Sequence, residues 1–147
     1  MLPKTVEYGL RAVVCLARLP DQRQSADQVA KATQVPRRYL HKVLQDLVKA
    51  GLVCSQSGPG GGYALIGSAE VISILDVVNA VGSIERIRRC PLGLQSHNEL
   101  CPLHRELDRA YEMLESSFER LTVAQVLDPS ASPSPLCDGV TDGQSEP

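Results

Sequence analysis

Tryptophan is absent from this chain of 147 residues, phenylalanine occurs once, and aromatic residues make up only 3% of the total. A core must therefore come mainly from Leu, Val, Ile and Ala, which suits one helical domain with appendages. No apolar run reaches the roughly 18–20 residues that span a bilayer, and the first residues lack the charged-then-apolar order of a secretory signal. We therefore expect a cytoplasmic protein with no membrane partner.

Charge is divided unevenly along the chain, although the formal net charge is only −2. Residues 1–66 hold nine Lys and Arg against four Asp and Glu, a net charge of +5, whereas residues 67–147 hold six against thirteen, a net charge of −7. A basic first half favours binding to a polyanion such as nucleic acid. The alternative is a one-sided surface charge that has no partner.

Hydrophobic spacing predicts a mainly α fold with one small β-hairpin. Ser25 is a candidate N-cap for the second helix, while Pro36 and Gly51 suit the first turn and the end of the third. Strands are expected over 52–56 and 63–66, on either side of a glycine-rich turn. The expected helices cover residues 5–19, 26–32, 36–50, 74–81, 102–121 and 123–127.

The order helix, short helix, tight link, basic helix and hairpin is typical of a winged helix-turn-helix. The remaining residues then form three further parts. We expect a connecting helix and sensor loop, a long dimerisation helix with a short terminal helix, and a disordered tail rich in Ser, Pro, Gly and Asp. The four parts, in order, cover residues 1–66, 67–101, 102–128 and 129–147.

The basic helix is the candidate DNA-reading element. In a winged helix-turn-helix, the N-terminal end of this helix enters the major groove. Arg side chains there pair bidentately with guanine, and Lys side chains bind phosphate. The alternative is a solvated helix face for the two Arg side chains and packing on the first helix for Tyr39. The candidate contacts are Pro36, Arg37, Arg38, Tyr39, His41 and Lys42, together with Ser25.

The hairpin turn is a second candidate contact with DNA. Its members Ser57, Gly58, Gly60 and Gly61 can approach a sugar–phosphate backbone closely, because glycine has no Cβ to clash. A nucleotide-binding loop would carry Lys followed by Ser or Thr and would open a helix. This turn instead leads through Tyr63 into a strand, so we interpret it as a wing.

Four segments carry a family resemblance: EYGLRA at 7–12, AGLV at 50–53, GPGGGYAL at 58–65 and ILDVVNAV at 74–81. They resemble the Rrf-type family of bacterial winged-helix transcriptional regulators, which includes IscR-like iron–sulfur regulators and NsrR-like nitric-oxide sensors. The resemblance covers residues 1–128. It implies a homodimer that represses or activates at a palindromic operator of double-stranded DNA. Members commonly carry Arg directly before the wing glycines, where this chain has Ser57, so a minor-groove contact is missing.

The candidate sensing residues are Cys90, His97, Cys101 and His104. Cys101 and His104 stand three residues apart at a helix start, so that one turn can aim both at one point. Thiolate and imidazole ligands suit zinc or iron–sulfur chemistry. The family resemblance implies three cysteines here, followed in some members by a histidine. The middle cysteine has no match in this chain, and His97 or Ser96 stands near its place.

Four roles for this segment stay open. A 2Fe–2S cluster with mixed Cys and His ligands would have a raised potential. A zinc site, a thiol switch between Cys90 and Cys101, and simple packing of the loop are the others. Glu7 resembles a ligand donated by the partner subunit of the nitric-oxide sensors, or it pairs with Arg11. The cysteines Cys15, Cys54 and Cys137 belong to no ligand spacing.

These observations predict a DNA-binding repressor that acts as a homodimer through the helix at 102–121 and senses redox, iron–sulfur or nitric-oxide status. A cluster-free regulator controlled by thiols, zinc or a partner protein is the alternative, since the acidic second half could bind such a partner. An enzyme built on Cys101 and His104 would need a substrate pocket and oxyanion donors. Nothing in the sequence marks either, so we predict no enzymatic activity.

Overall fold

A computed structural model describes residues 2–130 and residue 136 of the chain. The predicted tail at 129–147, with Cys137, lies mostly outside the described residues. Within them, the mainly helical fold with one small hairpin is confirmed. The elements are α1 (Lys4–Arg18), α2 (Ala26–Thr33), α3 (Arg37–Lys49), β1 (Val53–Gln56), β2 (Gly62–Leu65), α4 (Ile74–Val81), α5 (Pro102–Arg120) and α6 (Val123–Val126).

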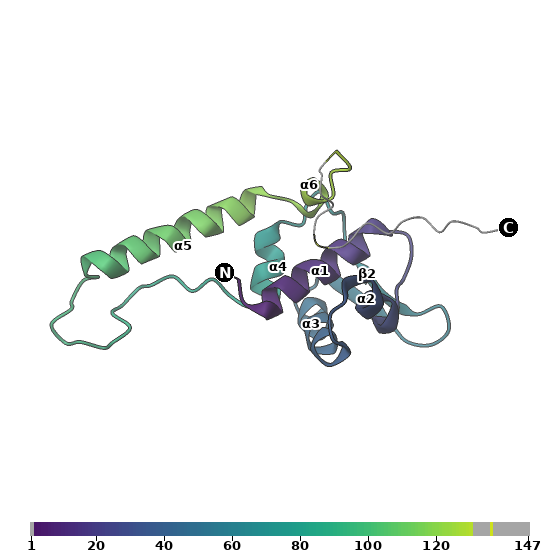
Figure 1. Cartoon of the computed structure of the whole chain (residues 1–147), viewed down its shortest axis with the longest axis horizontal. Helices are drawn as coiled ribbons and strands as arrows, with labels where there is room; N and C mark the ends of the chain where they lie inside the picture. Colours follow the sequence, from purple (N-terminus) through teal and green to yellow (C-terminus); the bar gives the residue numbers. More distant parts are fainter. Residues whose placement is uncertain (1, 131–135, 137–147) are drawn as a thin grey trace.

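Helix α1 lies at the centre of the body, with α2 and α3 on one side and α4 on another (Figure 1). Eight of its 15 residues are buried, so its apolar face is wider than that of a surface helix. Its partners are α2, α3, α4, α6 and strand β2. Aliphatic side chains make the core, as the composition predicted.

Local signals set the limits of the helix-turn-helix. The Ser25 hydroxyl accepts a hydrogen bond from the Gln28 backbone N–H, and the Gln28 side chain accepts one from the Ser25 N–H, which closes a capping box. Gln34 adopts a left-handed conformation at the end of α2. Pro36, expected in the first turn of α3, lies one residue before it as the N-cap. Helix α3 buries Leu40, Val43, Leu44 and Leu47.

Strands β1 and β2 pair in antiparallel register from Val53 with Leu65 to Gln56 with Gly62. The base of this wing is tied to the chain before α2 by two backbone hydrogen bonds between Gln24 and Tyr63, of 2.8 and 2.9 Å. Gly62 has a φ of +131°, and a Cβ there would lie 2.7 Å from the Gln24 carbonyl oxygen. Only glycine therefore allows this close approach.

Helix α5 projects away from the body (Figure 1). Its C-terminal end is fixed by backbone hydrogen bonds from Ile74 N–H to the Leu121 carbonyl, 2.8 Å, and from Val123 N–H to the Ile72 carbonyl, 2.9 Å. No residue of α5 is buried, although its sequence is amphipathic. Among the described helices, none combines the length and the apolar character needed to cross a membrane.

We expect Gly62→Ala to lower the free energy of unfolding by about 3 kcal/mol, because the cost of a positive φ adds to a steric clash at the wing base. Gly67→Ala is the matched control, since Gly67 has a φ of +84° but nothing within 4 Å of a Cβ. That control should lose about 1–2 kcal/mol. Urea unfolding followed by circular dichroism measures both. Equal losses would contradict the close packing of Gly62 on Gln24.

Candidate nucleic-acid interface and sensor loop

Packing of α3 on the core decides which of its side chains can meet DNA. The buried residues form one stripe at helical spacing. The predicted contact residues lie elsewhere on the helix, near its N-terminal end. All of them are exposed, namely Arg37, Arg38, Tyr39, His41 and Lys42. The structure thus places them together on one open surface, as a DNA-reading helix requires.

Tyr39 links this surface to the central helix. Its ring lies 5.9 Å from the ring of Tyr8 on α1, measured between centroids. The Arg38 guanidinium stacks over the Tyr39 ring at 4.6 Å and donates a hydrogen bond of 2.9 Å to the Tyr39 hydroxyl. Tyr39 therefore packs on α1, which was the alternative interpretation of this residue, and it also orients Arg38, which the sequence did not indicate.

Two other basic side chains of α3 form exposed ion pairs. Arg37 pairs with Asp27 of α2, and the Lys42 ammonium lies 2.9 Å from a carboxylate oxygen of Asp46. Exposed pairs of this kind contribute little stability. Both cations can therefore exchange their carboxylate for a phosphate at small cost.

The wing turn and the start of α2 lie next to each other. Ser57, Gly58 and Gly60 are exposed, and a turn hydrogen bond of 3.0 Å joins the Gly61 N–H to the Gly58 carbonyl. A Cβ on Gly62 would lie 3.2 Å from the backbone nitrogen of Ser25. The predicted wing contacts and Ser25 thus belong to one surface region.

The four predicted sensing residues form two separate pairs. Cys101 is the N-cap of α5, and its Sγ lies 3.4 Å from the Nδ1 of His104. Cys90 and His97 line a hollow of about 320 Å³ in the loop before α5. Within the described part of the chain, no three Cys, His, Asp or Glu side chains lie close enough to hold a metal ion. One shared centre would require the loop to bring the pairs together.

The donor atoms themselves fit a metal or an iron–sulfur cluster. Cys90 and Cys101 are free thiols and half-buried. The Nδ1 atom of His97 is buried without a hydrogen-bond partner, which is costly unless another ligand satisfies it. Imidazole nitrogen and thiolate sulfur are the donors that zinc and iron–sulfur clusters take.

Other candidate residues lie outside this loop. Glu7 is half-buried on α1. Among the described ion pairs none joins it to Arg11, whose guanidinium donates to the Thr33 carbonyl at 3.5 Å. The Cys15 thiol donates to the Gln24 side chain and the Cys54 thiol to the Ala64 carbonyl. These two cysteines therefore have local partners at the wing base.

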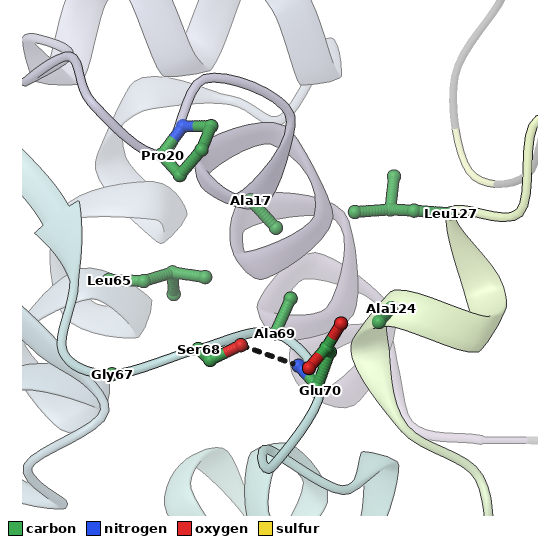
Figure 2. A pocket seen from close by; sticks show the side chains of 9 residues that line it. All are labelled: Ala17, Pro20, Leu65, Gly67, Ser68, Ala69, Glu70, Ala124 and Leu127. Carbon is green, nitrogen blue, oxygen red and sulfur yellow. Dashed lines mark hydrogen bonds between the residues drawn. The ribbon is translucent and has the colours of Figure 1, made fainter.

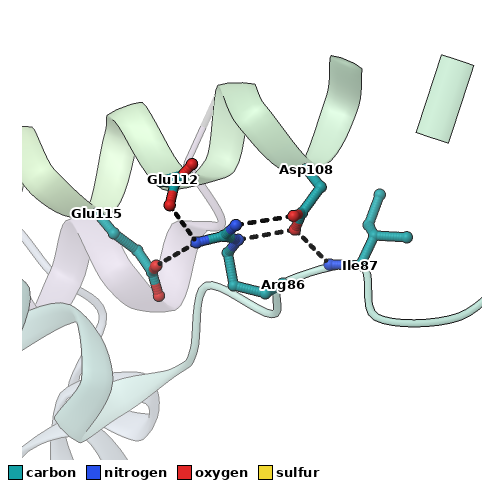
Figure 3. A network of polar contacts seen from close by, with 5 residues as sticks. All are labelled: Arg86, Ile87, Asp108, Glu112 and Glu115. Carbon is teal, nitrogen blue, oxygen red and sulfur yellow. Dashed lines mark hydrogen bonds and ion pairs between the residues drawn. The ribbon is translucent and has the colours of Figure 1, made fainter. Parts of the chain in front are cut away.

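Arg86 and Asp108 form a contact that the sequence analysis missed (Figure 3). The guanidinium Nε and Nη2 donate to the two carboxylate oxygens at 2.7 Å each, and the Ile87 N–H donates to the same carboxylate at 2.9 Å. Glu112 and Glu115 lie 3.5 Å from Arg86 Nη1. The available signal was the spacing of these three carboxylates on one side of a helix, although the sequence did not mark which of the arginines at 86, 88 and 89 would meet them.

A larger hollow of about 520 Å³ lies between the end of α1, the segment after the wing and α6 (Figure 2). Its lining is mostly apolar, with the Ser68 hydroxyl accepting a hydrogen bond from the Glu70 N–H at 3.2 Å. None of the residues predicted for DNA or metal binding lines it. The predicted DNA-binding site is therefore an open surface and the predicted metal-binding site is a loop, and neither of them is this hollow.

The fold and the exposed basic helix define a winged helix-turn-helix regulator. The chain belongs to the Rrf2 family, described as iron-dependent transcriptional regulators, which matches residues 2–129. Members of this family are DNA-binding regulators, so the chain is a transcriptional regulator and not an enzyme.

Known relatives agree with this assignment. BadM of Rhodopseudomonas palustris, named as an HTH-type transcriptional regulator, is 31% identical over 126 residues, which cover 86% of this chain and 80% of the relative. The structure of IscR from T. potens matches with a TM-score of 0.72 at 21% identity, over 86% of this chain and 85% of that one. CymR, the global cysteine regulator of B. subtilis, matches with a TM-score of 0.69 at 25% identity, over 86% and 95%.

The ion pair between Arg86 and Asp108 makes the free energy of unfolding depend on pH in the acidic range. Hydrogen bonds from Arg86, with a smaller contribution from the Ile87 N–H, lower the pKa of Asp108 from 3.8 to about 2. Because the folded pKa is depressed, this stabilisation is present above the ordinary pKa and is lost as pH falls from about 4 toward 2. We expect the stability difference between the wild type and Asp108→Asn to shrink over that range. Urea unfolding at stepped pH measures it, and a constant difference would contradict the pairing.

Proposed function

We propose that this regulator is a repressor that binds a palindromic operator as a homodimer and senses redox, iron–sulfur or nitric-oxide status through a cluster held by its sensor loop. The observation that carries the proposal is the Cys101–His104 pair at the start of the exposed helix α5. A ligand bound there lies on the element that would join two protomers. The same helix would then carry the sensing residues and set the distance between the two DNA-reading helices of the dimer.

The uncovered apolar side of α5 supports a dimer. Leu103 is 66% exposed and Leu107 41% exposed, whereas Leu114 and Phe118 near the other end are half-buried. Apolar side chains left open along a helix favour association with a second apolar surface. A two-fold dimer would place two copies of α3 in major grooves one helical turn apart, about 34 Å, or a multiple of it.

Four residues of the loop would hold the cluster, namely Cys90, His97, Cys101 and His104. Glu7 of the partner subunit is a further candidate ligand. When bound, a 2Fe–2S cluster would supply a one-electron redox couple whose potential is raised by histidine ligands. The chain's own part is to bring the Cys90–His97 side of the loop onto the Cys101–His104 pair. That closure would fix the loop against α5.

A cluster-free switch is the second candidate. It needs fewer donors than a cluster, because two free thiols can act without a third ligand. Oxidation would then join Cys90 to Cys101 as a disulfide. A regulator controlled by zinc or by a partner protein would likewise lack an iron–sulfur cluster.

Operator binding tests the DNA-reading helix. We expect Arg38→Ala to weaken binding to an operator selected from random duplexes by about 1–3 kcal/mol, with relaxed specificity at one base pair of each half-site. Lys42→Ala should weaken binding to all sequences and lower the salt slope by about one. Fluorescence anisotropy at several salt concentrations measures both, and footprinting should show two symmetric half-sites.

Lys49→Ala serves as the control for this series. Lys49 is exposed and lies in the last turn of α3, at the end away from the predicted contacts. Its loss should leave the affinity within a factor of two. If all three variants bind alike, α3 does not read the DNA. Binding of one chain to an asymmetric site would contradict the dimer.

A visible spectrum with metal analysis tests the cluster. We expect anaerobically purified protein to be brown-red and to contain iron and sulfide in equal amounts. Cys90→Ser and Cys101→Ser should lose the colour, because each removes a thiolate ligand, whereas Cys54→Ser should keep it. His97→Ala should shift the spectrum. A colourless, iron-free protein would overturn the cluster, and its zinc content would then separate a zinc site from a thiol or partner switch.

A further inference from the structure

The loop that carries Cys90 is fixed to α5 at both of its ends. At the first end, Asp108 holds the Arg86 guanidinium and the Ile87 N–H, and both charged side chains are largely buried, with 17% and 16% exposed. The second end is Cys101, the N-cap of α5. Among the ion pairs of the described residues, this one has the least exposed side chains, although it lies on the exposed helix α5.

The two fixed ends set how far Cys90 must reach. Asp108 and Cys101 are seven residues apart along the helix, and at a rise of about 1.5 Å per residue they are about 10 Å apart. Cys90 follows Ile87 by three residues, and three extended residues span about 10 Å. We call the segment from Ile87 to Cys90 the tether. Its length is just enough to place the Cys90 thiol beside Cys101 and His104.

We propose that Arg86 and Asp108 are positioning residues, which hold the loop on α5 at the point from which Cys90 reaches the Cys101–His104 pair. The inference rests on the proposed function in one respect, namely that Cys90 and Cys101 act at one centre. It holds for either a metal cluster or a disulfide there, because both need the two sulfur atoms close together.

Loss of the ion pair lengthens the tether. The preceding residue packed on the core is Ile84, six residues before Cys90 instead of three. The entropic cost of bringing two points together grows with about the 3/2 power of the tether length. Doubling this segment should thus lower the effective concentration of Cys90 at Cys101 by up to about threefold, because the eleven-residue separation between the two cysteines stays unchanged.

Thiol–disulfide exchange measures this effective concentration without any metal. The parent protein for this experiment is a variant in which Cys15→Ser, Cys54→Ser and Cys137→Ser are combined, so that only Cys90 and Cys101 can form a disulfide. In glutathione buffers the two protein thiols are oxidised to a disulfide, and glutathione disulfide takes up their two electrons and two protons to become two molecules of glutathione thiol. We expect Asp108→Asn to lower the equilibrium constant for this step by up to about threefold.

Two further variants sharpen the test. Glu106→Gln removes one negative charge from the same helix, from an exposed pair with Arg109, and should leave the constant unchanged. Arg86→Lys keeps the charge but loses the bidentate fork, and should give an intermediate loss. If Asp108→Asn proves less helical by circular dichroism, Arg86→Lys carries the test. Constants within 1.2-fold of the parent, about the expected error, in the folded variants would overturn the positioning role.

Failure of the proposed function would look different. Iron and sulfide analysis of the unaltered chain decides the cluster by itself. An iron-free chain whose Asp108→Asn variant still loses up to about threefold in exchange keeps the positioning role and loses the cluster. A chain that holds a cluster but whose exchange constant does not respond to Asp108→Asn keeps the cluster and loses the positioning role.

Discussion

Burial of α1 is the constraint on which the rest of the structure depends. This helix contacts α2, α3, α4, α6 and strand β2, so its side chains must be small where a neighbour comes close. At Gly9 an added Cβ would lie 2.8 Å from a methyl carbon of Val81 on α4. Helix α3, the candidate DNA-reading helix, and α4 therefore pack on one rigid support, because close-packed interiors tolerate little displacement.

Helix α5 is held by a different kind of interaction. None of its residues is buried, and it is fixed by backbone hydrogen bonds at its C-terminal end and by carboxylates that surround Arg86. Phe118 also packs against the core near that end, so the helix is anchored at its C-terminal end and at Arg86, and the rest of it lacks the cooperativity of a packed core. The molecule thus consists of a rigid DNA-binding body and a less constrained arm, an arrangement suited to a signal that changes the arm.

Sequence alone predicted what depends on near neighbours. Helix and strand limits fell within about one residue, because Ser25, Ser73 and Thr122 cap their own helices and the wing glycines form their own turn. A contact between distant residues was missed, since Arg86 meets Asp108 22 residues away. Packing of Tyr39 on the first helix was only one of two interpretations of that residue, and the ring of Tyr8 on α1 is its partner. The spacing of the sensing residues suggested one centre, whereas the loop, which has no periodicity to set its path, divides them into two pairs.

A series of contacts, interrupted only by the segment between α4 and Arg86, links the arm to the candidate DNA-reading surface of α3. Arg86 lies five residues beyond Val81, which packs against Gly9 beside Tyr8, and Tyr8 contacts the Tyr39 that orients Arg38. Contiguity is not itself coupling. It does restrict the outcome, since a displacement of α5 must either move this packed series or be absorbed in the few residues between α4 and Arg86. A firm hold at Arg86 leaves only that short segment to absorb the motion.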